Sequence, residues 1–183
     1  AFFGERVCQF FRVRASIGDG YVRFKARVAA GRGLGDEQGE ALARGRGGAG
    51  EQASATAHRL FRAGYRVLMT ELARPTAIRR TVAFCSAVYE GVAEVEGVRG
   101  VLCRVEDVDA LPAGPWPHVP VCVDPTGRLV RRWRPDVVVD ARLLKTNLDD
   151  SLDDAPLVIG LGPGLVAGRD VHYAVETMRG HDL

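Results

Sequence analysis

The sequence predicts an α/β protein, and three observations support this fold class. Short apolar runs of strand length alternate with an amphipathic helical stretch and with glycine and proline punctuation. A glycine-rich loop leads into that helix, and an acidic residue ends the strand that follows it. We therefore expect a Rossmann-like nucleotide-binding segment over residues 45–125 and a strand-rich C-terminal part over residues 126–183. Residues 1–44 are expected to form a poorly ordered or non-native N-terminal arm.

The N-terminal arm gives the weakest pattern. Short β-like pieces at residues 7–13 and 21–28 lead into a glycine-rich, charged stretch at 31–39. Residues 41–44 read as a poor strand, so the apolar strand expected ahead of the glycine loop is missing. The first 50 residues hold nine Lys or Arg and five acidic residues, but no motif organises this charge for nucleic acid.

The pattern sharpens from residue 45 onward. An apolar face over residues 53–63 predicts a helix, which Gly64 ends. Residues 65–70 predict a buried parallel strand that ends at Glu71. Pro75 predicts the start of a second helix, running to residue 89. Further short strands are expected at residues 92–95, 98–105, 119–123, 137–139, 157–161 and 171–177.

Composition bounds the class of protein. The chain has 183 residues, 46% of them hydrophobic, and a net charge of +2. Its four cysteines show no CxxC spacing, which favours reduced thiols in a cytoplasmic protein. No run approaches the roughly twenty apolar residues of a membrane span. Because the chain begins at Ala1 and stops after a dense polar run, we expect it to be a fragment of something longer.

The glycine loop fits a dinucleotide-binding fingerprint in two registers. Residues 45–50 match GxGxxG, and residues 48–53 match GxGxxA and lead directly into the helix. The second register is preferred, because the last small residue should lie where helix and strand pack. Glycines there allow a pyrophosphate to approach backbone N–H groups. The acid 21 residues beyond Gly50 would accept hydrogen bonds from a ribose diol. The predicted cofactor-binding residues are Gly48, Gly50, Ala53 and Glu71. The alternative is a turn that only lets strand and helix pack closely.

A second glycine turn, residues 160–164, follows an apolar strand. Its position makes Gly162 and Gly164 candidates for binding a phosphate, with a tight turn as the alternative. His and acidic residues crowd into the next stretch and are candidates for acid/base work or metal binding, although their spacing matches no metal motif. Lys145 follows another strand and could meet a phosphate or a carboxylate. The candidate catalytic residues are Asp170, His172, Arg179 and Lys145.

Many short segments beyond residue 46 recur in one family in the same order. They include Gly48-Ala49-Gly50-Glu51, Ile78-Arg79-Arg80, Val123-Asp124-Pro125, Lys145-Thr146-Asn147, Gly160 to Gly164, Asp170-Val171-His172 and Glu176 to His181. The chain resembles the YqeB-type selenium-dependent molybdenum hydroxylase system proteins over residues 46–183. The resemblance implies a Rossmann-like segment and an accessory role in supplying or installing the selenium-dependent molybdenum centre. The implied partner is a molybdenum hydroxylase of the xanthine dehydrogenase type. Family members continue past the Arg179–His181 segment, so a truncated C-terminal part is expected.

Three functions follow from these observations. The first is an accessory factor that binds a nucleotide or a nucleotide-bearing cofactor, namely a dinucleotide or a molybdopterin nucleotide. The second is an NAD-dependent oxidoreductase, against which stands the lack of a Tyr-x-x-x-Lys segment after the glycine loop. The third is a non-catalytic scaffold that docks the hydroxylase. Neither a nucleic acid nor a membrane is an expected partner.

Overall fold

The computed structural model describes residues 10–17, 20–27, 40–44 and 50–175 of the chain. The chain divides into two compact units, Ala1–Glu37 with Met178–Leu183, and Gln38–Thr177. These limits differ from the boundaries that the sequence suggests at residues 44 and 125. In the first unit, β1 (Phe10–Ile17) pairs with β2 (Gly20–Arg27) as an antiparallel hairpin. The two strands overlap the predicted β-like pieces within the described residues.

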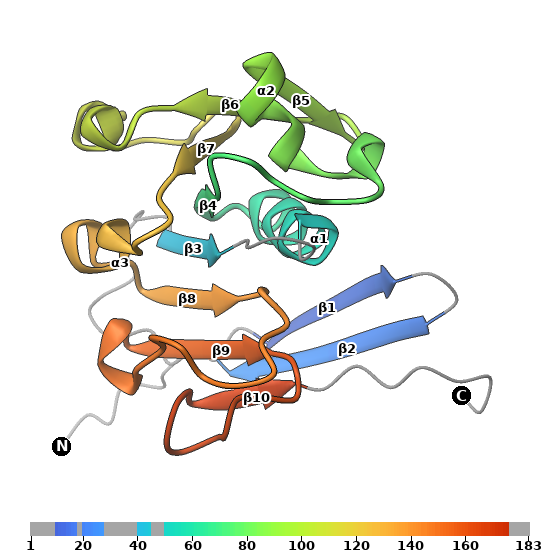
Figure 1. Cartoon of the computed structure of the whole chain (residues 1–183), viewed down its shortest axis with the longest axis vertical. Coiled ribbons are helices and arrows are strands. Elements are labelled where there is room, and N and C mark those ends of the chain that lie inside the picture. The colour runs from blue at the N-terminus through green and yellow to red at the C-terminus, as the bar shows by residue number, and fades with distance from the viewer. Residues whose placement is uncertain (1–9, 18–19, 28–39, 45–49, 176–183) are drawn as a thin grey trace, which may run out of the picture. The chain divides into compact units, whose positions relative to one another are not determined.

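An eight-stranded sheet dominates the second unit (Figure 1). Its order is β10-β9-β8-β3-β4-β7-β6-β5, and only β5 runs antiparallel to its neighbour. The predicted α/β class is therefore confirmed. The strands are β3 (Glu40–Arg44), β4 (Arg66–Glu71), β5 (Val92–Val95), β6 (Val98–Cys103), β7 (Val119–Val123), β8 (Val137–Asp140), β9 (Leu157–Leu161) and β10 (Tyr173–Val175).

The strand order reverses between β3 and β8. Without the β5–β6 hairpin at one edge, the remaining six strands, numbered along the chain, lie in the order 6-5-4-1-2-3. That is a common order of doubly wound α/β sheets, in which ligands bind outside the carboxyl ends of the strands at the point of reversal. In this chain the point of reversal lies between the first and fourth of these strands, β3 and β8.

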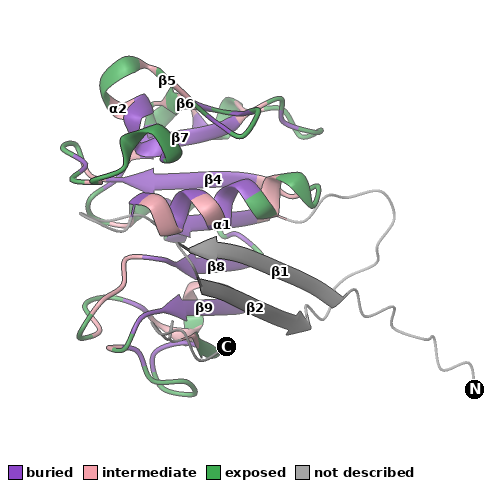
Figure 2. Cartoon of the chain, turned by 90° about the vertical axis from the view of Figure 1, so that its right-hand side faces the viewer, coloured by how far each residue is buried: buried purple, intermediate pink, exposed green. Residues whose placement is uncertain are grey.

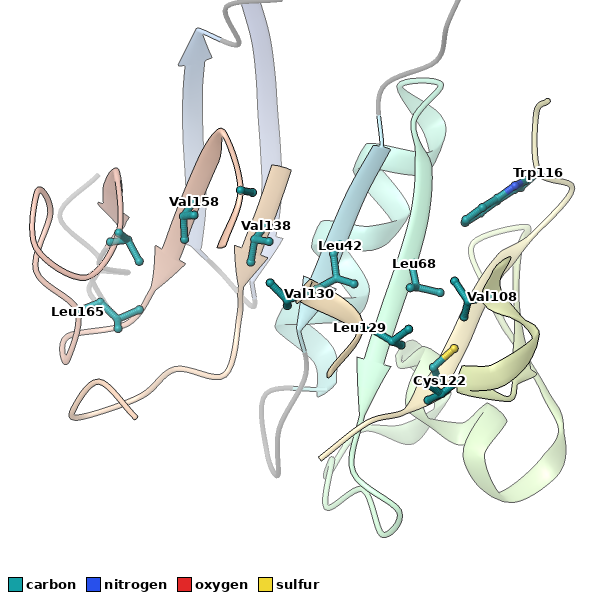
Figure 3. Packing of buried hydrophobic residues seen from close by; sticks show 13 residues of the cluster. Leu42, Leu68, Val108, Trp116, Cys122, Leu129, Val130, Val138, Val158 and Leu165 are labelled. Carbon is teal, nitrogen blue, oxygen red and sulfur yellow. The ribbon is translucent and has the colours of Figure 1, made fainter. Parts of the chain in front are cut away.

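Helices cover both faces of the sheet. The 13-residue helix α1 (Gly50–Arg62) lies over β3 and β4 on one face (Figure 2), and α3 (Arg128–Trp133) lies on the other. Figure 3 shows Leu129 of α3 near Leu42 and Leu68, whose side chains share the face that α3 covers. This cluster extends along the sheet through Val138 and Val158. Apolar surface on both faces explains why these strands read as continuous apolar runs.

The expectation that no strand precedes the glycine loop is wrong. Glu40–Arg44 forms β3, and its residues Ala41, Leu42 and Ala43 are fully buried at the centre of the sheet. Alanine has a low strand propensity, but burial between two neighbouring strands can determine the conformation in place of propensity. Here β3 is hydrogen-bonded to β4 on one side and to β8 on the other.

The helix predicted from Pro75 to residue 89 is also wrong. The structure has two 3-10 turns, Arg80–Val82 and Phe84–Ser86, and the short helix α2 (Ala87–Glu90). Contacts with α1 hold this segment in an irregular path. The Phe84 N–H donates to Ser54 Oγ at 2.8 Å, and the Arg79 N–H donates to Glu51 Oε1 at 3.1 Å. Tertiary contacts therefore satisfy N–H groups that a helix would have bonded internally.

The C-terminal part contains α3 and the 3-10 turn Leu152–Asp154 besides its strands. A further 3-10 helix, Val105–Ala110, follows β6. The predicted strand at 171–177 is shorter than expected, since β10 covers Tyr173–Val175 and residues 176–177 lie outside the described part. None of the helices in the described ranges has the length and apolar character that crossing a membrane requires.

Candidate functional site

The carboxyl ends of the central strands form the candidate site. Arg44 ends β3 and lies level with Asp140, the last residue of β8, across the point where the strand order reverses. Glu71 ends the neighbouring strand β4. Residues 45–49 join β3 to α1, so the predicted glycine loop connects to the sheet at this point. Gly48 itself lies outside the described residues.

The first turn of α1 packs closely against residues 75–86. A Cβ on Gly50 would lie 2.9 Å from Ala77 Cβ and 3.2 Å from Cys85 Sγ. Ala53, one turn further on, is fully buried. The Glu51 carboxylate also forms an ion pair with Arg79 Nε at 3.0 Å. Gly50 is therefore required by protein packing, whether or not a ligand also approaches it.

Glu71 is nearly inaccessible in this conformation, with 1% of its surface exposed. Its Oε1 accepts a hydrogen bond from the Leu72 N–H at 2.8 Å. Burial raises the pKa of the Glu71 carboxyl, and burial with the nearby Glu71 charge raises the pKa of Cys85 to about 11. Both groups thus favour their neutral forms. A ribose diol can reach Glu71 only after the carboxyl becomes exposed.

The second glycine turn is filled by the protein's own backbone. A Cβ on Gly164 would lie 2.2 Å from the carbonyl carbon of Lys145 and 2.3 Å from the Thr146 nitrogen. Gly162 has φ +129°, and a Cβ on it would lie 2.9 Å from the Leu143 Cα. The Gly164 N–H donates to the Leu144 carbonyl at 2.9 Å. The alternative of a tight turn therefore accounts for both glycines without a phosphate.

Asp170 and His172 hold backbone in place. Asp170 Oδ2 accepts the Val166 N–H at 2.8 Å, and its ion pair with Arg169 at 2.9 Å holds the pKa of the carboxyl well below its usual range. His172 Nδ1 accepts the Val158 N–H at 3.0 Å. Each polar side chain already has a local structural partner.

Of the candidate catalytic residues that the structure describes, His172 and Lys145 lie near opposite ends of β9. The hydrogen bond to Val158 places His172 beside the start of β9, whereas Lys145 packs against Gly164, beyond the carboxyl end of that strand. Lys145 is exposed, and Arg179 lies outside the described residues. No group of His, Cys, Asp or Glu within the described ranges is arranged to hold a metal ion.

The sequence analysis missed a buried charge network after β8. Arg142, with 6% of its side chain exposed, lies among the carboxylates of Asp140, Asp149 and Asp150. Its Nε donates to Asp140 at 2.6 Å and its Nη2 donates to Asp150 at 2.8 Å. These bonds raise the pKa of Arg142 despite its burial. The sequence does show a high density of opposite charges within residues 140–150. A solvated loop can have the same density of charges, so this pattern does not identify a buried network.

Comparison with known proteins identifies one relative. The chain is 46% identical over 136 residues to the uncharacterized protein YqeB of Escherichia coli (strain K12). The match supports a YqeB-like family. It covers 74% of this chain, which spans about a quarter (25%) of the length of the relative. No family model and no solved structure matches the chain.

Proposed function

We propose that this chain binds a nucleotide at the glycine loop between β3 and α1, and that it serves as an accessory factor in maturation of selenium-dependent molybdenum hydroxylases. The observation that supports nucleotide binding is the coincidence of three features at one place. A glycine-rich loop follows the first strand of the doubly wound order, enters a 13-residue helix and adjoins the point of strand reversal. The positive end of a helix dipole there favours a phosphate.

The chain's own residues fit the phosphate part of a dinucleotide or a molybdopterin nucleotide better than the ribose part. The first turn of α1, beginning at Gly50, supplies backbone N–H groups, and a pyrophosphate is stabilised at this position in such folds. Glu71 is positioned at the end of the next strand, but its carboxyl is buried and bonded to Leu72. Ribose recognition by Glu71 therefore requires a local opening around this residue.

The accessory role rests on the family resemblance, which names a molybdenum hydroxylase of the xanthine dehydrogenase type as the partner. Similarity to YqeB supports the family and not the role. A test of the role compares hydroxylase activity in cells that lack the gene and are complemented with the wild-type or Gly48→Val protein. We expect the variant to leave the hydroxylase without its mature centre. Full activity in the uncomplemented cells would overturn the accessory role.

Calorimetric titration of the full chain with NAD, NADP, ATP and a molybdopterin nucleotide tests the binding site directly. Gly48→Val is the test variant, because Gly50 also serves packing against Ala77. Gly114→Ala is the matched control, since a Cβ there meets nothing within 4 Å. We expect binding to the wild type and the control and its loss in Gly48→Val. If none of the four ligands binds the wild type, nucleotide binding is refuted and a docking scaffold becomes the better account. Hydride transfer from NADH to a small substrate would favour an oxidoreductase.

A further inference from the structure

Two cysteines face each other across the neighbouring strands β6 and β7. Cys103 ends β6, and its partner in the register of the parallel β6–β7 pair is Cys122 of β7. Strands in a sheet lie about 4.8 Å apart, and in-register side chains point to the same face. Disulfides span Cα atoms about 4.4–6.8 Å apart. The Cα separation is therefore within the range of disulfides, and closing the bond requires the two Cβ atoms to approach to about 3.5–4.5 Å.

The two thiols also differ in accessibility. Cys122 is fully buried beside Val108 and Leu129 (Figure 3), whereas Cys103 is half-buried at the edge of the same cluster. Both are free thiols in this structure. A partly exposed thiol beside a buried thiol is the arrangement of an attacking and a resolving cysteine.

The two thiols also differ in pKa. The neighbouring Cys122 thiol lowers the pKa of Cys103, whereas Cys103 and burial raise the pKa of Cys122. The Cys103 thiol donates a hydrogen bond to the Arg104 carbonyl at 3.4 Å. The neighbouring Arg104 favours the Cys103 thiolate, and the Asp107 carboxylate opposes it. The accessible sulfur is thus the one whose thiolate is stabilised, and a thiolate is the reactive form.

We propose that Cys103 and Cys122 form a redox pair that closes to a disulfide across β6 and β7 when the chain meets a small-molecule disulfide such as glutathione disulfide. The Cys103 thiolate attacks one sulfur of the oxidant, whose S–S bond breaks and releases one glutathione, which takes up the proton that Cys103 lost. Cys122 then attacks the Cys103 sulfur of the mixed disulfide and gives up its own proton to the second departing glutathione. Two cysteine thiols are oxidised, and one glutathione disulfide is reduced to two thiols.

Closing this bond affects the third strand of the doubly wound order. Cys122 lies two residues before Asp124, whose carboxylate accepts the Leu129 N–H at 2.8 Å at the start of α3. Cys103 leads directly into the 3-10 helix Val105–Ala110, which packs in the same core. The disulfide would cross-link the β5–β6 hairpin to β7. Oxidation is therefore expected to stabilise the pairing of β6 with β7.

Peptide mapping of the full chain tests the pair. The protein is equilibrated in glutathione buffers of rising disulfide content, quenched with acid, alkylated, digested and analysed by mass spectrometry. We expect Cys103 and Cys122 to lose alkylation together in one-to-one proportion and to appear in a linked peptide, while the buried Cys85 stays alkylated. Two free thiols at Cys103 and Cys122 in the most oxidising buffer, or a link from Cys103 to another cysteine, would overturn the proposal.

Two serine variants separate the attacking from the resolving role. In Cys122→Ser, Cys103 should stop at the mixed disulfide with glutathione, because nothing resolves it. In Cys103→Ser, the buried Cys122 should acquire no glutathione. Circular dichroism reports whether each variant folds, and the wild-type map decides the question if a variant does not. A glutathione adduct on Cys122 in folded Cys103→Ser would contradict the proposed order of attack.

Discussion

The two glycine turns of this chain look alike in sequence and differ in what surrounds them. Both follow a buried strand of the same mostly parallel sheet, β3 in the first case and β9 in the second. The first turn enters the 13-residue helix α1, whereas no helix follows the second, which runs through Leu165 to Val171 into β10. The second turn has the backbone of residues 143–146 against its glycines.

This difference shows what a glycine after a strand means physically. The residue marks a place where something approaches the backbone more closely than a Cβ allows. At Gly164 that neighbour is another segment of the chain, and at Gly50 it is the segment around Ala77. Only the loop ahead of Gly50 leads into a helix whose N-terminus offers unpaired N–H groups. The helix that follows, more than the glycine spacing, therefore makes the first turn the better candidate for a ligand.

The largest expected effect comes from the support beneath the second turn. Residues 143–146 follow Arg142, which is bonded to the fully buried carboxylates of Asp140 and Asp150. Arg142→Met removes the cation and leaves those carboxylates buried without it. Removing one partner of a buried ion pair lowers the free energy of unfolding by about 3–5 kcal/mol. Urea denaturation followed by circular dichroism measures this loss.

Arg128→Met is the matched control for Arg142→Met. Arg128 is 63% exposed and lies 3.9 Å from Asp124, so its removal should change the free energy of unfolding by only about 0–1 kcal/mol. Arg142→Lys keeps the charge without the guanidinium fork and should fall between the two. Equal stability of the Arg142→Met and Arg128→Met proteins would show that the network does not hold the loop.

Gly164→Ala tests the second turn itself. The added Cβ would meet Lys145 and Thr146 backbone atoms at 2.2–2.3 Å, so the two loops must separate. Overpacking of this kind lowers stability by about 1–3 kcal/mol. The change in the urea midpoint should be clear against Gly114→Ala, whose Cβ meets nothing. A stable Gly164→Ala protein would return this turn to the list of candidate ligand sites.

Sequence reasoning recovered the elements that carry a local signal. The helix at 53–63, the strand ending at Glu71 and the strands around 119–123, 137–139 and 157–161 agree with α1, β4, β7, β8 and β9. It failed for β3, because Ala41 and Ala43 owe their strand to hydrogen bonds with β4 and β8 and not to propensity. It also failed for the segment after Pro75, whose path depends on contacts with α1.

The structural partners of the candidate site residues were hidden for the same reason. Asp170 and His172 look reactive in a list of residues, but their partners are the backbone N–H groups of Val166 and Val158. Nothing in the spacing along the chain reveals those bonds. The Cys103–Cys122 pair was hidden as well, since the register of β6 against β7 brings together residues that are far apart in sequence.

The first turn yields a smaller expected effect, on affinity more than on stability. Gly48→Val should raise the dissociation constant of whichever nucleotide binds by at least about tenfold, or about 1.4 kcal/mol. A side chain at this position would keep the phosphate away from the loop backbone. Gly164→Ala, in contrast, should leave the affinity of the folded fraction unchanged. Isothermal calorimetry on both variants sharpens the comparison, and equal affinities in Gly48→Val and wild type would contradict a ligand at the first turn.

The smallest effect concerns Glu71 and depends on pH. Burial raises the pKa of this carboxyl above its ordinary value of 4.5, so the folded chain binds the proton more tightly than the unfolded chain does. The resulting stability is fully present below about pH 4.5 and is lost as the pH rises through the folded pKa. Glu71→Gln cannot ionise, so its free energy of unfolding does not fall with that of the wild type. The difference between variant and wild type should therefore increase in favour of the variant as the pH rises through this range, measured by urea denaturation at a series of pH values. The exposed Glu90→Gln control should show no such gain.

If a ribose diol binds ionised Glu71, the affinity of the wild type for NAD should rise over the same pH range. The Glu71→Gln variant should lose that rise. A flat affinity in both proteins would leave the first turn with a phosphate contact alone.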